Sequence, residues 1–273
     1  MKTILVPVDF SETANKALTI AKDIAKKTNA SLHLANFYSI PVADYSYPDI
    51  SMPGEIMEQI RIAALKGMEL LTDGLKEEGV QAESTVKMGL ATDGIIDIAE
   101  ELNVDLIVMG TTGASGILNK LIGSNASSVM QRTEKPIILV PKEFTFNGIA
   151  HIAYTDSLHE DDTPVLKQLF DFASVVGAGQ VCIVNINTTG HYEPVDAKLY
   201  DSINNAFGTE KIKWDFIDAD NIKEGLDSYI DNHQIDLVAM STHKKTLMER
   251  IFSKSNTRMM ALYSKVPVLV FHK

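Results

Sequence analysis

Short runs of aliphatic residues alternate along the first half of the chain with stretches whose apolar positions recur at every third and fourth residue. The first pattern is typical of buried strands and the second of amphipathic helices. Strands are predicted over residues 3–8, 32–38, 105–109 and 137–140, with a further strand that closes at Val86. Helices are predicted over residues 14–25, 55–78, 92–102 and 124–132, and Ser11 is the expected N-cap of the first. This alternation predicts a parallel sheet covered by helices on both faces.

The same order of elements returns in the second half, with strands predicted over residues 149–155, 180–186, 211–217, 235–240 and 266–271. Asn36 matches Asn185 at an offset of 149 residues, and Asp105 matches Asp236 at an offset of 131. The second copy is therefore 18 residues shorter between its second and fourth strands. The sequence predicts an α/β protein of two tandem domains, residues 1–143 and 148–273, each an open five-stranded parallel sheet with helices on both faces.

Composition and charge argue against a nucleic-acid-binding protein and against a membrane protein. Of the 273 residues, 36 are Asp or Glu and 25 are Lys or Arg, which gives a net charge of -11. With no basic run, this charge argues against nucleic acid or an anionic membrane as the main partner. The longest apolar runs reach about six residues, whereas a membrane-spanning helix needs about 18. Because Met1 and Lys2 lead directly into a strand-like segment without an apolar signal region, we expect a cytoplasmic protein.

Polar residues and glycines follow the predicted strands at their carboxyl ends, which is the edge where an open parallel sheet binds ligands. Asp9 follows the first strand and Gly110 the fourth. From Gly110 the chain continues with two residues, Gly113, nine residues, Gly123 and then Ser124. Glycines let backbone N–H groups approach a ligand, and a helix that begins at Ser124 offers unpaired N–H groups and the positive end of its dipole. The pattern predicts a phosphate site.

Together with the strand order and the segment Val6-Pro7-Val8-Asp9, this glycine pattern resembles the universal stress proteins of the ATP-binding branch, over essentially the whole chain as a tandem pair. The resemblance implies the Rossmann-like fold of the adenine-nucleotide α-hydrolases, with ATP as the ligand and Mg²⁺ on its phosphates. It also implies that the aspartate lies by the nucleoside, that the end of the second strand contacts adenine through its backbone, and that the glycine loop wraps the phosphates. The site residues implied in this way are Pro7, Val8, Asp9, Asn36, Met109, Gly110, Gly113, Gly123, Ser124 and Asn125.

The second half departs from this pattern. The positions of the three glycines are taken by Ser241, Lys244 and Lys254, while the aspartate and the serine are retained as Asp156 and Ser255. Side chains then fill the space that a phosphate needs. We therefore expect the second domain to serve mainly as a structural partner, although its two lysines can attract a different anion.

Simpler interpretations of the same residues stay open. Asp9 can cap the first helix, the glycines can serve in turns only, and Thr111, Thr112 and Lys120 are as well explained by loop or solvent contacts as by phosphate. The chain has neither a Walker loop nor a dinucleotide fingerprint, and the metal-like pattern that starts at His159 breaks at Thr163. We expect no metal site made of protein ligands.

No catalytic residue is identified, because nothing in the glycine loop supplies an evident base to activate water. We therefore expect ATP binding without efficient turnover. A slow ATP hydrolase or phosphotransferase, and a scaffold with a vestigial pocket, are the alternatives.

Two further expectations concern assembly and the loop over residues 41–53. The apolar strands 137–140 and 268–271 would leave exposed edges if unpaired, so we expect them to pair within the chain as a pseudo-dimer, with a homo-oligomer left open. The loop is longer than usual connections, and the second copy lacks 18 residues in the interval that contains it. We expect it to lie beside the pocket, with Tyr45 or Tyr47 over the base; a surface excursion unrelated to the ligand is the alternative.

Overall fold

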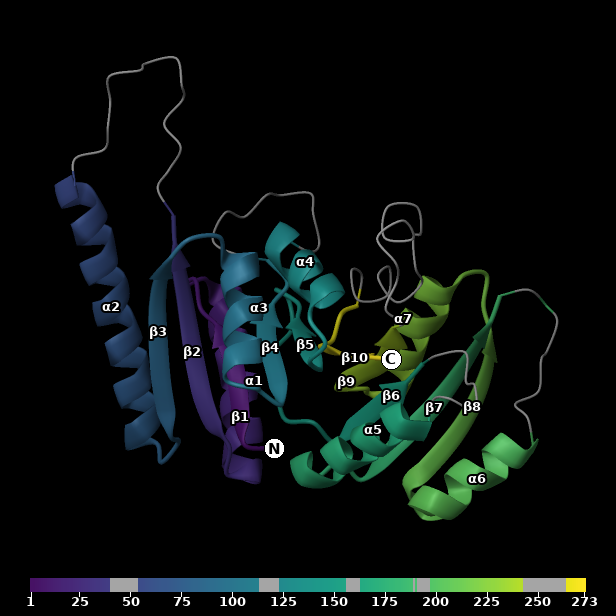
Figure 1. The fold of residues 1–273 in the computed structure, drawn as a ribbon. Coiled ribbons are helices and arrows are strands. Elements are labelled where there is room, and N and C mark those ends of the chain that lie inside the picture. The colour runs from purple at the N-terminus through teal and green to yellow at the C-terminus, as the bar shows by residue number, and fades with distance from the viewer. Residues whose placement is uncertain (40–53, 113–122, 156–162, 189, 191–196, 243–263) are drawn as a thin grey trace.

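A computed structural model describes residues 1–39, 54–112, 123–155, 163–188, 190, 197–242 and 264–273 (Figure 1). The strands are β1 (Thr3–Pro7), β2 (Ser31–Tyr38), β3 (Ala82–Met88), β4 (Leu106–Gly110), β5 (Ile137–Val140), β6 (His151–Tyr154), β7 (Gln180–Asn187), β8 (Ile212–Asp218), β9 (Leu237–Thr242) and β10 (Val268–His272). The helices are α1 (Glu12–Thr28), α2 (Gly54–Glu77), α3 (Ala91–Glu101), α4 (Ser124–Arg132), α5 (Thr163–Val176), α6 (Ala197–Phe207) and α7 (Ile222–His233), with a 3₁₀ turn, η2 (Thr209–Lys211).

The strands join into one sheet in the order β3-β2-β1-β4-β5-β10-β9-β6-β7-β8. Within each half all described pairings are parallel, and the two halves repeat the same order of strands. Between the halves β5 and β10 pair antiparallel, with Leu269 opposite Ile138. The α/β fold with two five-stranded halves is confirmed, and so is the expected pairing of the last strands. The two sheets are continuous with each other at that edge.

Side chains alternate along each strand and divide the core between the two faces of the sheet. In β1, Ile4 and Val6 belong to one buried cluster and Leu5 to the other. Helices α1, α2, α5 and α6 contribute to the first cluster, whereas α3, α4 and α7 contribute to the second. The predicted covering of both faces by helices is confirmed. No helix in the described part of the chain is long and apolar enough to cross a membrane.

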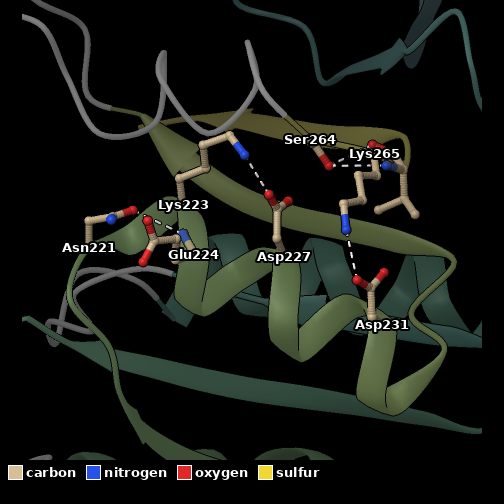
Figure 2. Close-up of polar contacts among 8 residues, drawn as sticks. Asn221, Lys223, Glu224, Asp227, Asp231, Ser264 and Lys265 are labelled. Atoms are coloured by element: carbon tan, nitrogen blue, oxygen red, sulfur yellow. Dashed lines mark hydrogen bonds and ion pairs between the residues drawn. The ribbon is translucent and has the colours of Figure 1, made fainter.

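Two helix ends illustrate how local sequence fixes these elements. The Ser11 side chain accepts a hydrogen bond from the backbone N–H of Ala14 at 3.1 Å, which confirms it as the N-cap of α1. In the second half, the Asn221 side chain caps α7 by accepting the N–H of Glu224 at 3.0 Å (Figure 2). Lys265, just before β10, reaches Asp231 of the same helix at 2.7 Å. These contacts tie α7 to the sheet.

Equivalent aspartates directly precede β4 and β9, the fourth strand of each half. Asp105 accepts the backbone N–H groups of Lys2 and Thr3 at 2.6 and 2.9 Å, and Asp236 accepts those of Ala150 and His151 at 2.8 and 2.9 Å. Burial alone would raise the pKa of Asp105, but the two N–H donors outweigh it, so this pKa lies below its usual value. The repeat seen in the sequence is therefore also a repeat of individual contacts.

Candidate nucleotide-binding site

A hollow of about 270 Å³ opens at the carboxyl ends of β1 and β4, where the strand order of the first half reverses. Its wall is formed by β1, β2 and β4, by the residues that follow β1 and β4, and by the first turns of three helices. The described residues that line it are Pro7, Val8, Asp9, Ala14, Ala35, Phe37, Ala91, Ile95, Met109, Gly110, Thr111, Thr112, Gly123, Ser124, Asn125 and Ala126.

The structure brings most of the predicted site residues together on this wall. Those that line the hollow are Pro7, Val8, Asp9, Met109, Gly110, Gly123, Ser124 and Asn125. Several other predictions lie outside the described residues, namely those for Gly113, Lys120, Tyr45, Tyr47, Asp156, Lys244, Lys254 and Ser255. Asn36 is described, and it does not line the hollow.

The side chain of Asn36 lies on the face of β2 away from the hollow. Its side chain is buried and donates a hydrogen bond from Nδ2 to the carbonyl of Val8 at 2.7 Å. Because side chains alternate along β2, the neighbours Ala35 and Phe37 belong to the opposite face, and they line the hollow instead. Asn36 therefore fixes the end of β1 from behind the wall.

Asp9 is part of the turn that joins β1 to α1. Its Oδ1 accepts a hydrogen bond from the backbone N–H of Ser11 at 3.0 Å, while Ser11 itself caps the helix. Asp9 is thus not the N-cap of α1. It is also the one carboxylate among the described lining residues.

Gly110 makes room for helix α1 and not, as expected, for a ligand. A Cβ at this position would lie 2.7 Å from Cγ2 of Thr13 and 3.1 Å from the backbone carbon of the same residue. The glycine therefore allows the first turn of α1 to approach β4 closely, and the space of its missing Cβ is already filled. Thr13 also contacts Thr112 through their hydroxyl oxygens, which are 3.1 Å apart.

Two helices begin at the hollow without a side-chain cap. Neither Leu90, before α3, nor Gly123, before α4, caps its helix through a side chain. The two helices pack side by side (Figure 1), and Thr92 donates to Oδ1 of Asn125 at 3.2 Å between their first turns. Backbone N–H groups and the positive ends of two helix dipoles therefore converge on one place.

The contribution of α3 was missed by the sequence analysis. Ala91 and Ile95 carry no polar atom in their side chains, so nothing in their chemistry marks them as part of a binding site. The one sequence signal for α3 is the lack of a capping residue: Gly89 and Leu90 precede the helix, where Ser, Thr, Asp or Asn would be expected. An ion pair of 2.6 Å between Arg132 and Asp93 further holds α4 beside α3.

The chemistry of the described wall favours an anion with an apolar part. No Lys or Arg is among the described lining residues, so backbone N–H groups, hydroxyls and the side-chain amide of Asn125 are the donors there. Apolar side chains supply the rest of the surface, including Val8, Phe37 and Met109. Within the described residues, no group of three or more His, Cys, Asp and Glu is placed to hold a metal ion.

In the second half, Ser241 stands at the position of Gly110 and is buried. Another glycine is retained, since Gly225 stands at the position of Gly94. An added Cβ on Gly225 would lie 2.7 Å from Cγ2 of Ile186, so the glycine leaves room for this side chain. Gly94 leaves room for Phe37 in the same way in the first half. The retained glycine thus serves helix–sheet packing, and the glycine at the end of the fourth strand is the one that is lost.

Comparison with known proteins gives consistent matches over about half of the chain. The model of the universal stress protein family matches residues 1–141. A universal stress protein of Methanocaldococcus jannaschii is 32% identical over 146 residues, which cover 52% of this chain and 82% of the relative. The universal stress protein YxiE of Bacillus subtilis is 31% identical over 143 residues, 50% of this chain and 97% of the relative.

A likeness in fold extends over both halves. The crystal structure of a universal stress protein from Archaeoglobus fulgidus superposes with a TM-score of 0.77 at 18% identity, and the match covers 99% of this chain and 96% of that one.

Proposed function

The chain belongs to the universal stress protein family, and we propose that its first half binds ATP in the hollow between β1 and β4. The observation that carries this proposal is the convergence of two uncapped helix N-termini, those of α3 and α4, on one hollow. Such N-termini bind phosphate because their N–H groups are unpaired and their dipoles favour negative charge.

The remainder of the wall suits a nucleoside. Ala35, Phe37 and Ile95 offer an apolar surface for a flat base, and Asp9 offers a carboxylate that can accept hydrogen bonds from ribose hydroxyls. A free phosphate would leave this apolar surface without a partner. A ligand with an apolar ring at one end and a polyanion at the other uses the whole hollow, and ATP is such a ligand.

We further propose that ATP binds as its Mg²⁺ complex. Mg²⁺ in such sites takes most of its ligands from phosphates and water, with one or two carboxylates from the protein. In this proposal the phosphates and water supply the ligands of the ion, and the Asp9 carboxylate serves the ribose.

The two halves have different tasks in this proposal. We place the domains at residues 1–143 and 148–273, with the second as a structural partner in an intramolecular pseudo-dimer. The antiparallel pairing of β5 with β10 supports this arrangement, and the replacement of the other two glycines by Lys244 and Lys254 supports loss of the site in the second half.

Thermal unfolding with and without MgATP, combined with an assay of phosphate release, tests the proposal. A ligand that binds only the folded state increases the free energy of unfolding, by about 2.7 kcal/mol when its concentration is one hundred times its Kd. The midpoint of thermal unfolding rises as a result. We expect a higher midpoint with MgATP, little effect of tripolyphosphate, and no phosphate release above the rate of ATP alone. Rapid phosphate release would instead identify a hydrolase, and an unchanged midpoint would identify a scaffold with a vestigial pocket.

A further inference from the structure

Phe10 stands in a backbone conformation that bulky side chains rarely adopt. Its φ is 60°, in the left-handed region, which for such a residue signals local strain. Phe10 is the central residue of the turn across which Oδ1 of Asp9 accepts the N–H of Ser11. The conformation at residue 10 therefore determines where the Asp9 carboxylate lies.

The ring of Phe10 is seated on α2. A Cβ on Gly67 would lie 2.8 Å from both Cε1 and Cζ of this ring, so the glycine is what leaves room for it. The side chain is 44% exposed, which means that deep burial in the core does not hold it.

We propose that Phe10 is a positioning residue, whose ring, seated on Gly67, holds residue 10 in the left-handed conformation and so directs the Asp9 carboxylate toward the hollow. The inference rests on the proposed function, because Asp9 belongs to that site. It gives α2 a part in nucleotide binding although none of the described lining residues comes from α2.

The same helix provides a matched pair of substitutions. Gly67 and Gly74 lie seven residues apart and so share a face of α2, but a Cβ on Gly74 would have nothing within 4 Å. Gly67→Ala should displace the ring and weaken ATP binding about tenfold, the effect expected when residue 10 is free to leave its strained conformation. Gly74→Ala should leave ATP affinity unchanged.

Substitutions of Phe10 separate positioning from simple packing. Phe10→Gly removes the ring but accepts the left-handed conformation without steric cost, whereas Phe10→Ala removes the ring and keeps the cost. We expect Phe10→Gly to bind ATP more tightly than Phe10→Ala. In the Phe10→Gly background, Gly67→Ala should have no further effect, because there is no ring left to displace. If packing alone mattered, Phe10→Gly would bind ATP more weakly than Phe10→Ala.

A ligand-free measurement distinguishes failure of this inference from failure of the proposed function. Hydrogen exchange of the Ser11 amide, followed by NMR without nucleotide, reports on its bond to Asp9. We expect faster exchange in Gly67→Ala and Phe10→Ala and no change in Gly74→Ala. If the wild-type protein does not bind ATP, the proposed function fails while the exchange result still decides the positioning role. If the Ser11 amide of Gly67→Ala exchanged at the wild-type rate, the inference would be overturned.

Discussion

Phe37, which lines the hollow, packs against Gly94 of α3. A Cβ on Gly94 would lie 2.0 Å from Cε1 of the Phe37 ring and 2.7 Å from Cδ1. The glycine thus lets α3 approach β2 with the ring between them, and the ring in turn lines the hollow. Helix packing and the shape of the site depend on the same residue.

Gly94→Ala should therefore destabilise the protein. The added methyl group forces the Phe37 ring out of its place, which we expect to cost about 1–3 kcal/mol of the free energy of unfolding. Urea denaturation measures the change. Gly74→Ala is the control: with no neighbour within 4 Å of the new Cβ, it should stabilise α2 by up to about 1 kcal/mol. Equal effects of the two substitutions would show that Phe37 does not pack on Gly94.

Ser124→Asp should move stability and binding in opposite directions. Ser124 is the exposed first residue of α4, where a carboxylate interacts favourably with the helix dipole and stabilises the fold by about 0.3–1 kcal/mol. The same charge repels a triphosphate, and we expect ATP affinity to fall at least about tenfold. Ser124→Asn, which has the shape without the charge, should bind far better than Ser124→Asp. Unchanged affinity in Ser124→Asp would place the phosphates elsewhere.

The residues on the wall were only partly within reach of sequence reasoning. Asp9 and Gly123 could be selected because their residue types suit ligand contact. Asn36 was selected because the resemblance places the end of the second strand at adenine. Its side chain, however, follows Leu32 and Leu34 on the face of β2 that is turned away from the hollow. The wall residues on α3 could not be selected by chemistry, since only the fold brings that helix to the site.

At the scale of elements, α1 and α2 are joined by a small group of charges. Glu78, just after α2, pairs with Lys22 and Lys26 of α1, each at 2.9 Å. Hydrogen bonds from these two lysines lower the pKa of Glu78 to about 2. Glu78 and Lys26 are exposed and Lys22 is half-buried, so salt should weaken these ion pairs.

The Glu78 contribution should depend on pH in a defined direction. Because the folded-state pKa lies below the unfolded value of 4.5, the contribution is present above about pH 4.5 and is lost as the pH falls toward about 2. We expect Glu78→Gln to be slightly less stable than the wild type at neutral pH and low salt, and the difference to vanish near pH 2. Urea denaturation across this range provides the comparison. A difference that does not change with pH would show that the ion pairs add nothing to stability.

Elements with a clear apolar pattern were predicted closely. The helix over residues 124–132 and the strand over residues 137–140 have the predicted bounds. The third strand instead continues past Val86 to Met88, opposite Tyr38 of β2. It is an edge strand with mostly exposed side chains, so its pairing with β2 extends it where hydrophobic pattern gives no signal.

At the scale of the whole molecule, the two halves form one sheet whose edges are β3 and β8. The antiparallel pairing of β5 and β10 places both strands at the centre, where all their side chains except that of His272 are buried. Strands that would be open edges in separate domains are protected in this arrangement. The equivalence of the two halves could be predicted from the repeat, whereas continuity of the sheet depends on how the halves meet.

Hydrogen exchange of the full chain tests this arrangement. Amides of Leu139 and Val268, which face each other across the seam, should be among the slowest to exchange, because opening them requires separation of the two halves. Amides of the edge strands β3 and β8 should exchange faster. Exchange of β5 as fast as that of β3 would mean that the halves do not share a sheet in solution.

The central claim is that one hollow, in the first half only, binds ATP through the N-termini of α3 and α4. Calorimetric titration of the full chain with MgATP tests it most directly, because one experiment yields both affinity and stoichiometry. We predict saturable binding of about one ATP per chain, lost or strongly weakened in Ser124→Asp. Absence of saturable binding, two sites per chain, or undiminished affinity in Ser124→Asp would contradict it.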